Sequence, residues 1–224
     1  MLPTLQIALL WAAFIWLHVY VREPARRARL RARYGPKTYG WAFGVTALAL
    51  FVPMLHVIAK YRHTGPVLYM IQDDVPGLRW IAVGMIATGF TFLLQPSWKA
   101  GTHLRVRGFH RITRDPWLTG WWLVGLGHLL MNGSLFDVVA FGGFLVYPVI
   151  NVVAQERWHA RDHAAAHRKV TSQTSILPFV AILQGRQRLA PRELPWVKML
   201  VLWALLATFY AHHQLVLYWL TTLG

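Results

Sequence analysis

Long apolar runs alternate with short polar stretches along the whole chain. Six runs of 16 to 25 residues come close to the roughly 20 residues that a helix needs to cross a bilayer. They are residues 2–21, 39–58, 78–95, 117–132, 135–153 and 196–220. We expect helices, because a lipid-facing backbone must satisfy its own hydrogen bonds and no run alternates like a barrel strand. The predicted fold class is all-α: one polytopic membrane domain, residues 1–224, with about six transmembrane helices.

The basic residues gather in three of the loops. Of the 23 lysines and arginines, 20 follow the first, third and fifth runs, and three lie in the other loops. The positive-inside rule therefore places both termini on the non-cytoplasmic side. The net charge of +15 follows from this topology, and no extramembrane stretch is long enough for a nucleic-acid-binding domain. The first run lacks a basic leader and a cleavage site, so we expect a retained span.

Two short motifs predict where helices begin. Asp115 before Pro116 is typical of an N-cap followed by the first helical position of the fourth run. Ser134 and Asp137 match a capping box for the fifth run. Because only residues 132–134 separate these two runs, they should form an antiparallel hairpin.

Aromatic and glycine residues suggest how the helices sit and pack. Aromatic rings, Trp11 among them, gather near the ends of the runs, where they would anchor the helices at headgroup depth. The pairs Gly40/Gly44 and Gly120/Gly127 leave smooth faces. Such a face lets a neighbouring helix approach, which is the commoner reason for it, or a flat cofactor.

Five histidines lie within the apolar runs: His18, His56, His128, His212 and His213. An imidazole in hydrocarbon is costly without a partner, which makes each one a functional-site candidate. Two imidazoles from facing helices can hold a haem iron inside a bundle. The chain has no cysteine, which excludes disulfides, thiolate ligands and covalent haem attachment. An interhelical hydrogen bond is the alternative for each histidine taken alone.

His128 is the best placed of the five. Trp121 and Val124 share its side of the helix, while Gly125 and Gly127 remove bulk beside it. We expect this arrangement to make room for a macrocycle. The alternative is a histidine that is hydrogen-bonded across the hairpin.

A second histidine cluster lies outside the apolar runs. His159, His163 and His167 are spaced at i, i+4 and i+8 and would line one face of a helix. Such a pair as His159 and His163 can chelate zinc or copper. A solvated, weakly basic helix face explains the spacing equally well.

Three stretches resemble the NnrU family, which also includes the plant and cyanobacterial 15-cis-zeta-carotene isomerases. They are WLHVYVREPARRARLRARYGPKTYG (16–40), GFHRITRDPWLTGWWLVGLGHLLMNG (108–133) and QTSILPFVAILQGR (173–186). The second is similar to the family's R-I-T-R-H-P entry and A-H-L-L-A-N-G exit, and the third to its T-S-x-x-P-F segment ending in G-R. The stretches occur in family order and span most of the chain.

The resemblance implies a multi-pass protein of the bacterial inner membrane, embedded in the lipid bilayer. It leaves a membrane-protein partner or an oligomer open. Bacterial members are associated with nitric oxide metabolism and denitrification. Isomerase members are haem b proteins whose iron is held by histidines, and the matching positions are His18 and His128. The family's R-H-P histidine is replaced by Asp115. If that histidine takes part in the chemistry, this chain binds the cofactor without performing the family reaction.

Helix geometry complicates the pairing of His18 with His128. His18 lies near the cytoplasmic end of its run and His128 near the outer end, so their depths differ by about 10 to 15 Å in upright helices. The axial ligands of one iron should be level. By depth alone, His56 or the pair His212/His213 are better partners for His128.

Two other functions remain open. The R-x-P-x-x-x-G pattern from Arg114 to Gly120, with Glu156, resembles the isoprenylcysteine and phospholipid methyltransferases. In that reading Arg114 would hold the carboxylate of S-adenosylmethionine and Glu156 its ribose or amine. A non-catalytic accessory subunit is the other alternative. The haem-binding NnrU-like function is the preferred hypothesis.

Overall fold

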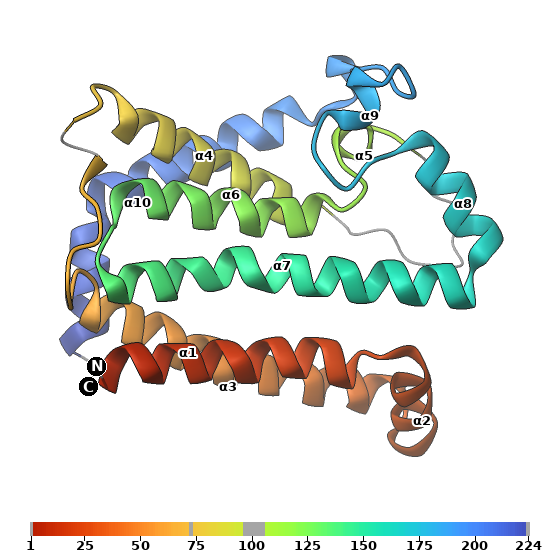
Figure 1. Ribbon diagram of the computed structural model, residues 1–224, viewed down its shortest axis with the longest axis horizontal. Coiled ribbons are helices and arrows are strands. Elements are labelled where there is room, and N and C mark those ends of the chain that lie inside the picture. Colours follow the sequence, from red (N-terminus) through yellow and green to blue (C-terminus); the bar gives the residue numbers. More distant parts are fainter. Residues whose placement is uncertain (1, 72–73, 96–105, 223–224) are drawn as a thin grey trace.

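The computed structural model describes residues 2–71, 74–95 and 106–222. Its long helices lie side by side, joined by short helices and loops (Figure 1). The elements are α1 (Leu2–Trp16), the π-helical turn η1 (Leu17–Val21), α2 (Pro24–Tyr34), α3 (Pro36–Tyr61), α4 (Leu78–Leu93), α5 (Phe109–Ile112), α6 (Pro116–Met131), α7 (Leu135–Asp162), α8 (Ala164–Gln173), α9 (Val180–Leu183), the 3-10 turn η3 (Pro191–Glu193) and α10 (Trp196–Thr222). The predicted all-α class is confirmed.

Four stretches of the described chain are long and apolar enough to cross a membrane: Leu2–Val21, Pro36–Tyr61, Leu135–Asp162 and Trp196–Trp219. Helices α4 and α6 have 16 residues each, a little short of a full crossing. The count of six spans therefore stays a prediction. Helix α7 has 28 residues and continues beyond the predicted run, because its last turns are polar and reach past the apolar core.

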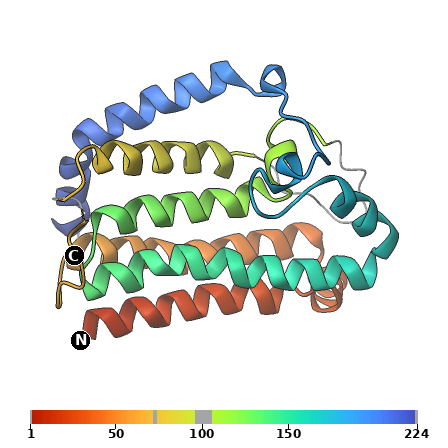
Figure 2. The same cartoon turned by 45° about the horizontal axis from the view of Figure 1, so that its top comes forward.

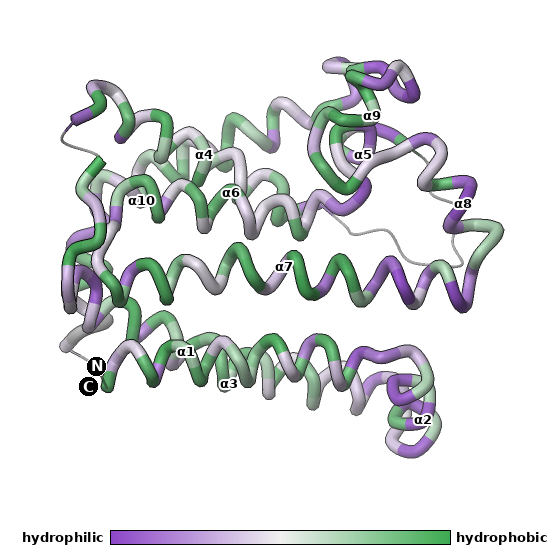
Figure 3. Tube along the Cα trace, in the orientation of Figure 1, coloured by the Kyte–Doolittle hydropathy of each residue, from purple (hydrophilic) through white to green (hydrophobic). Residues whose placement is uncertain are grey.

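The ends of the bundle differ in polarity. The start of α1, the end of α10 and the α6–α7 turn lie at one end, and α2, α5, α8 and α9 lie at the other (Figures 1 and 2). Figure 3 shows polar residues gathered at the end that holds α2 and α8. The start of α1 and the end of α10 thus lie at the same end, and the predicted topology across a membrane stays a prediction. Part of one basic loop, residues 96–105, lies outside the described residues.

Both predicted helix starts are confirmed. The Asp115 carboxylate accepts a hydrogen bond from the Leu118 backbone N–H at 3.2 Å, and Pro116 is the first residue of α6. The Ser134 hydroxyl accepts one from the Asp137 N–H at 3.1 Å and donates one to the Asp137 carboxylate at 2.7 Å. These caps fix the ends of the α6–α7 hairpin.

An aromatic core joins α1, α3, α6 and α7. Trp11 is 4% exposed, and its indole N–H donates to the Ala140 carbonyl at 2.8 Å. Its ring packs directly on Gly143 of α7. The expectation that Trp11 anchors the helix at headgroup depth is therefore wrong, because its position on α1 faces α7 rather than lipid.

Atoms of neighbouring helices occupy the space beside the glycines of α6. A Cβ at Gly120 would lie 2.6 Å from the Gly89 carbonyl oxygen of α4, and one at Gly127 would lie 2.6 Å from Ile86. A Cβ at Gly125 would lie 2.7 Å from Phe144 of α7. The expectation of room for a macrocycle beside His128 is therefore wrong at these glycines, and helix packing accounts for them.

Candidate functional site

His18 lies in η1, which continues α1 towards the polar end of the bundle. Its ring is 6% exposed, and Nδ1 lies 2.8 Å from the Phe14 carbonyl oxygen one turn earlier. Ring centroids of Phe14, Phe43 and Tyr147 lie 4.2, 5.1 and 5.2 Å from that of His18. The imidazole is thus fixed in direction and walled by aromatic rings.

His128 is held in the same way on α6. Its Nδ1 lies 2.8 Å from the Val124 carbonyl oxygen, again one turn earlier, and its ring stacks on Phe141 at 4.5 Å and 17°. In both histidines a neutral imidazole that donates from Nδ1 keeps its lone pair on Nε2. Metal-binding histidines are commonly oriented by this kind of Nδ1 hydrogen bond.

The two histidines do not meet. His18 contacts α7 at Tyr147 and His128 contacts it at Phe141, six residues away, or about 9 Å along the helix. A row of rings fills the space between: Tyr147 to Trp121 at 5.4 Å, Trp121 to Phe144 at 5.2 Å and Phe144 to Phe141 at 6.3 Å. The offset in depth expected from the sequence is present. The two imidazoles therefore lie in separate environments.

The remaining histidines of the apolar runs lie elsewhere. His56 is half-buried on α3. His212 is exposed on α10, and Nδ1 of His213 lies 2.6 Å from the Tyr210 carbonyl oxygen. Helix α10 packs on α3 and α4 and ends where α1 starts, at the end of the bundle away from α2 (Figures 1 and 2). His212 and His213 are thus not brought together with His18.

A polar cluster closes the other end of the α6–α7 pair. Nη2 of Arg114 donates to the Glu156 carboxylate at 2.8 Å, and Nε2 of His167 lies 3.0 Å from the same oxygen. The Arg114 side chain is 8% exposed. Burial lowers the pKa of its guanidinium, while the charge of Glu156 opposes that shift. The two residues assigned to S-adenosylmethionine in the methyltransferase reading form an ion pair with each other.

The second and third NnrU-like stretches pack together beside this cluster. The Arg114 N–H donates to the Ser175 carbonyl at 2.6 Å, the Thr113 hydroxyl to the Ile176 carbonyl at 2.8 Å, and the Phe179 N–H to that of Ile112 at 2.8 Å. Arg186, which ends the third stretch, donates to the carbonyls of residues 171, 172 and 174. The motifs therefore form a shared cap over α6. The sequence alone shows the two stretches but not their contact, since 39 residues separate them.

The surface histidines do not form one helical face. Helix α7 ends at Asp162, and α8 begins after His163 with a change of direction at that residue. The rings of His159 and His167 face each other with centroids 6.3 Å apart. Within the described ranges, no group of three or more His, Asp or Glu side chains is placed to hold a metal ion. The expected continuous face is wrong because the helix breaks at its middle histidine.

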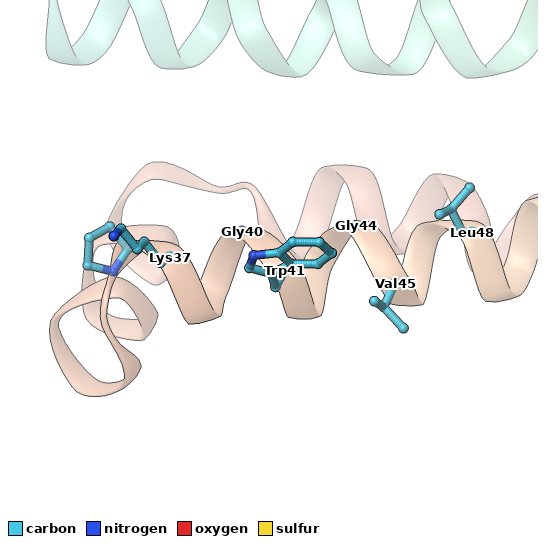
Figure 4. A pocket seen from close by; sticks show the side chains of 7 residues that line it. Lys37, Gly40, Trp41, Gly44, Val45 and Leu48 are labelled. Carbon is cyan, nitrogen blue, oxygen red and sulfur yellow. The ribbon is translucent and has the colours of Figure 1, made fainter.

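A shallow apolar groove follows one face of α3 from Pro36 to Leu48 (Figure 4). A Cβ at Gly40 or Gly44 would meet no atom within 4 Å. Trp41 forms part of its lining. The candidate histidines do not line this groove, so it is separate from the aromatic core.

Known proteins place the chain in a family. The family described as NnrU protein matches residues 6–219. The 15-cis-zeta-carotene isomerase of Zea mays chloroplasts is 26% identical over 80% of this chain and 52% of its own length. That of Arabidopsis thaliana is 25% identical over 94% of this chain and 60% of its own length. The chain thus spans a little over half the length of these relatives, and no solved structure matches it. The chain belongs to the NnrU family and is a distant homologue of 15-cis-zeta-carotene isomerase.

Proposed function

We propose that this NnrU family membrane protein binds haem b in its aromatic core and catalyses redox-dependent cis/trans isomerisation of an apolar polyene. The observation that carries the proposal is the shared arrangement of His18 and His128, each with Nδ1 bonded to a carbonyl of its own helix. That arrangement leaves Nε2 as the metal-binding nitrogen. The two relatives named as isomerases support the reaction class.

Each imidazole could hold an iron through Nε2, but the pair does not fit a single iron. The rings of Trp121, Phe144 and Tyr147 lie between the two histidines. We therefore assign one histidine to the iron, and His18 is the better candidate. Arg22 is the C-cap of the turn that holds His18, and a haem carries propionates that need cationic partners.

A haem held by His18 would supply the redox chemistry for isomerisation of an alkene or for handling of nitric oxide, which is associated with bacterial NnrU proteins. The side chains of this protein would hold the imidazole in one direction and exclude water. Phe14 and Phe43 pack on His18, and Leu17 beside it is 6% exposed. A polyene dissolved in lipid would reach such a site without crossing water.

We expect Asp115 to affect the rate of isomerisation and not the binding of haem. Where the family has histidine, this chain has a carboxylate that is 7% exposed and caps α6. A capping carboxylate is a structural role, so we expect haem binding to persist without a histidine here. Asp115→His tests whether the family residue raises the isomerisation rate.

Absorption spectra of the protein purified in mild detergent test the haem proposal. We expect a Soret band in the oxidised and reduced forms, and a loss of haem content of about tenfold or more in His18→Ala. His213→Ala on α10 is the matched control and should keep full haem content. Equal loss in His128→Ala would show that the bundle rearranges to bring both imidazoles to one iron.

Other outcomes identify the alternatives. A colourless protein that binds S-adenosylmethionine would support the methyltransferase, with Arg114 and Glu156 separating to reach it. A colourless protein that binds neither cofactor would support the accessory subunit. For the coloured protein, chromatography of a cis-polyene incubated with the reduced form measures isomerisation directly, and an unchanged isomer ratio would contradict the proposed reaction.

A further inference from the structure

Two buried polar atoms in the aromatic core have no hydrogen-bond partner in the part of the chain that the structure describes. They are the Tyr147 hydroxyl and the Trp121 indole N–H. Tyr147 is 0% exposed, and its ring contacts that of Trp121 with centroids 5.4 Å apart at 74°. Both atoms therefore lie in one cluster, between α6 and α7.

Other indoles of the bundle are paired. Trp11 donates to the Ala140 carbonyl at 2.8 Å, Trp122 to the Leu145 carbonyl at 2.9 Å, and Trp203 to the Thr91 hydroxyl at 2.8 Å. A buried donor that stays unpaired costs more free energy than an ordinary hydrogen bond contributes. Such groups are rare in native proteins and each one asks for an explanation. Two of them on rings that contact each other indicate a shared partner that is not part of this chain.

We propose that Tyr147 and Trp121 form a two-donor binding site for a small neutral ligand that presents an acceptor oxygen. An indole N–H can only donate, so the ligand must accept. The surroundings are aromatic rings, which disfavour a charged ligand. Phe14, Trp117 and Phe144 pack around the pair at centroid distances of 5.2 to 5.9 Å, which favours a ligand of a few atoms. An ordered water and a diatomic molecule share this chemistry.

The site adjoins His18, whose ring centroid lies 5.2 Å from that of Tyr147. Only this link rests on the proposed function: if His18 holds an iron, a ligand of that iron would lie near the Tyr147 ring. The site itself follows from the unpaired donors and needs no haem.

Thermal unfolding in detergent tests the site. If Tyr147 donates to a ligand, Tyr147→Phe should lower the midpoint by about 2 to 4 °C. Tyr69→Phe is the matched control, because its hydroxyl donates to the Leu129 carbonyl at 2.6 Å and its loss should have the same sign. A raised midpoint in Tyr147→Phe, with the usual decrease in Tyr69→Phe, would overturn the proposal, since removing a truly unpaired hydroxyl relieves its burial cost.

Carbon monoxide distinguishes the two sources of the oxygen. Resonance Raman spectra of the reduced protein with carbon monoxide should show a shifted C–O stretch in Tyr147→Phe if the site binds an iron-bound ligand. An unshifted stretch together with a lowered midpoint would assign the site to ordered water. A preparation without a Soret band would refute the proposed haem function, and the thermal comparison would still decide this proposal.

Discussion

Helices α6 and α3 both present glycines on an otherwise apolar surface, but the face of α6 is covered by a neighbouring helix and that of α3 is open. Gly120 and Gly127 of α6 are covered by α4, with backbone atoms close enough to touch. Gly40 and Gly44 of α3 meet nothing within 4 Å and form the floor of an open groove (Figure 4). A smooth helix face therefore indicates that close approach is possible, but only the neighbours decide whether it is used.

The largest expected effect is that of Gly120→Ala. The added Cβ would lie 2.6 Å from the Gly89 carbonyl oxygen and 2.8 Å from the Leu93 backbone nitrogen, and backbone atoms cannot rotate away. We expect a decrease of about 1 to 3 kcal/mol in the free energy of unfolding, measured by thermal unfolding in detergent. A neutral result would mean that α4 and α6 are not in contact as described.

Gly127→Ala should cost less than Gly120→Ala. The new Cβ would lie 2.6 Å from the Ile86 Cγ1 atom, a side-chain contact that another rotamer can relieve in part, and 2.8 Å from the Ala82 carbonyl oxygen. We expect a loss of about 1 kcal/mol, measured in the same way. A cost above that of Gly120→Ala would place the tightest part of the interface nearer the C-terminal end of α6.

Gly44→Ala should have the opposite sign. Alanine in a helix is about 0.5 to 1 kcal/mol more favourable than glycine, and nothing within 4 Å opposes the added Cβ. The thermal midpoint should rise slightly, and Gly40→Ala should behave alike. A decrease in both variants would show that another molecule packs into the α3 groove in the purified protein.

Acid should lower the stability of the fold at the Arg111–Glu193 ion pair, which is separate from both glycine faces. The Arg111 guanidinium, which contacts Glu193 through two hydrogen bonds of 2.8 and 2.9 Å, and the Gly108 N–H lower the pKa of Glu193 from 4.5 to about 2. A carboxylate with a lowered pKa stabilises the fold above its unfolded pKa, so this contribution should fade as the pH falls from about 4.5 to 2.

The control for this pH effect is Glu193→Gln, whose midpoint should depend less on pH over that range. Gly44→Ala should keep the pH dependence of the unsubstituted chain. An equal acid dependence in Glu193→Gln would assign the effect to other carboxylates. This is the smallest of the four effects, because the pair lies partly in solvent.

The sequence predicts where the helices run better than which of their sides meet. The caps at Asp115 and Ser134 are correct, since capping chemistry is a local property, whereas α7 ends nine residues beyond its predicted run. The long helices are apolar on all sides, however, so their pattern says little about which side of each helix contacts a neighbour. For that reason Trp11 is buried where an anchor is expected, and the glycines beside His128 face helices instead of a cofactor.

The candidate site shows the same division. The different depths of His18 and His128 follow from their places in the sequence, but their Nδ1 hydrogen bonds and the aromatic rings between them follow from three-dimensional packing. The break at His163 is also invisible in a regular i, i+4, i+8 spacing, because alanine and histidine permit a helix without requiring its continuation.

The π-helical turn at Leu17–Val21 has a consequence for His18. A π turn accommodates one more residue than an α turn, and such turns are associated with functional sites. Deleting a single residue there would let the helix regularise and swing the following side chains by about 100° around its axis. The direction of the His18 imidazole thus depends on the number of residues in this turn as well as on their identity. A relative whose turn is one residue shorter before its histidine would point that histidine in another direction.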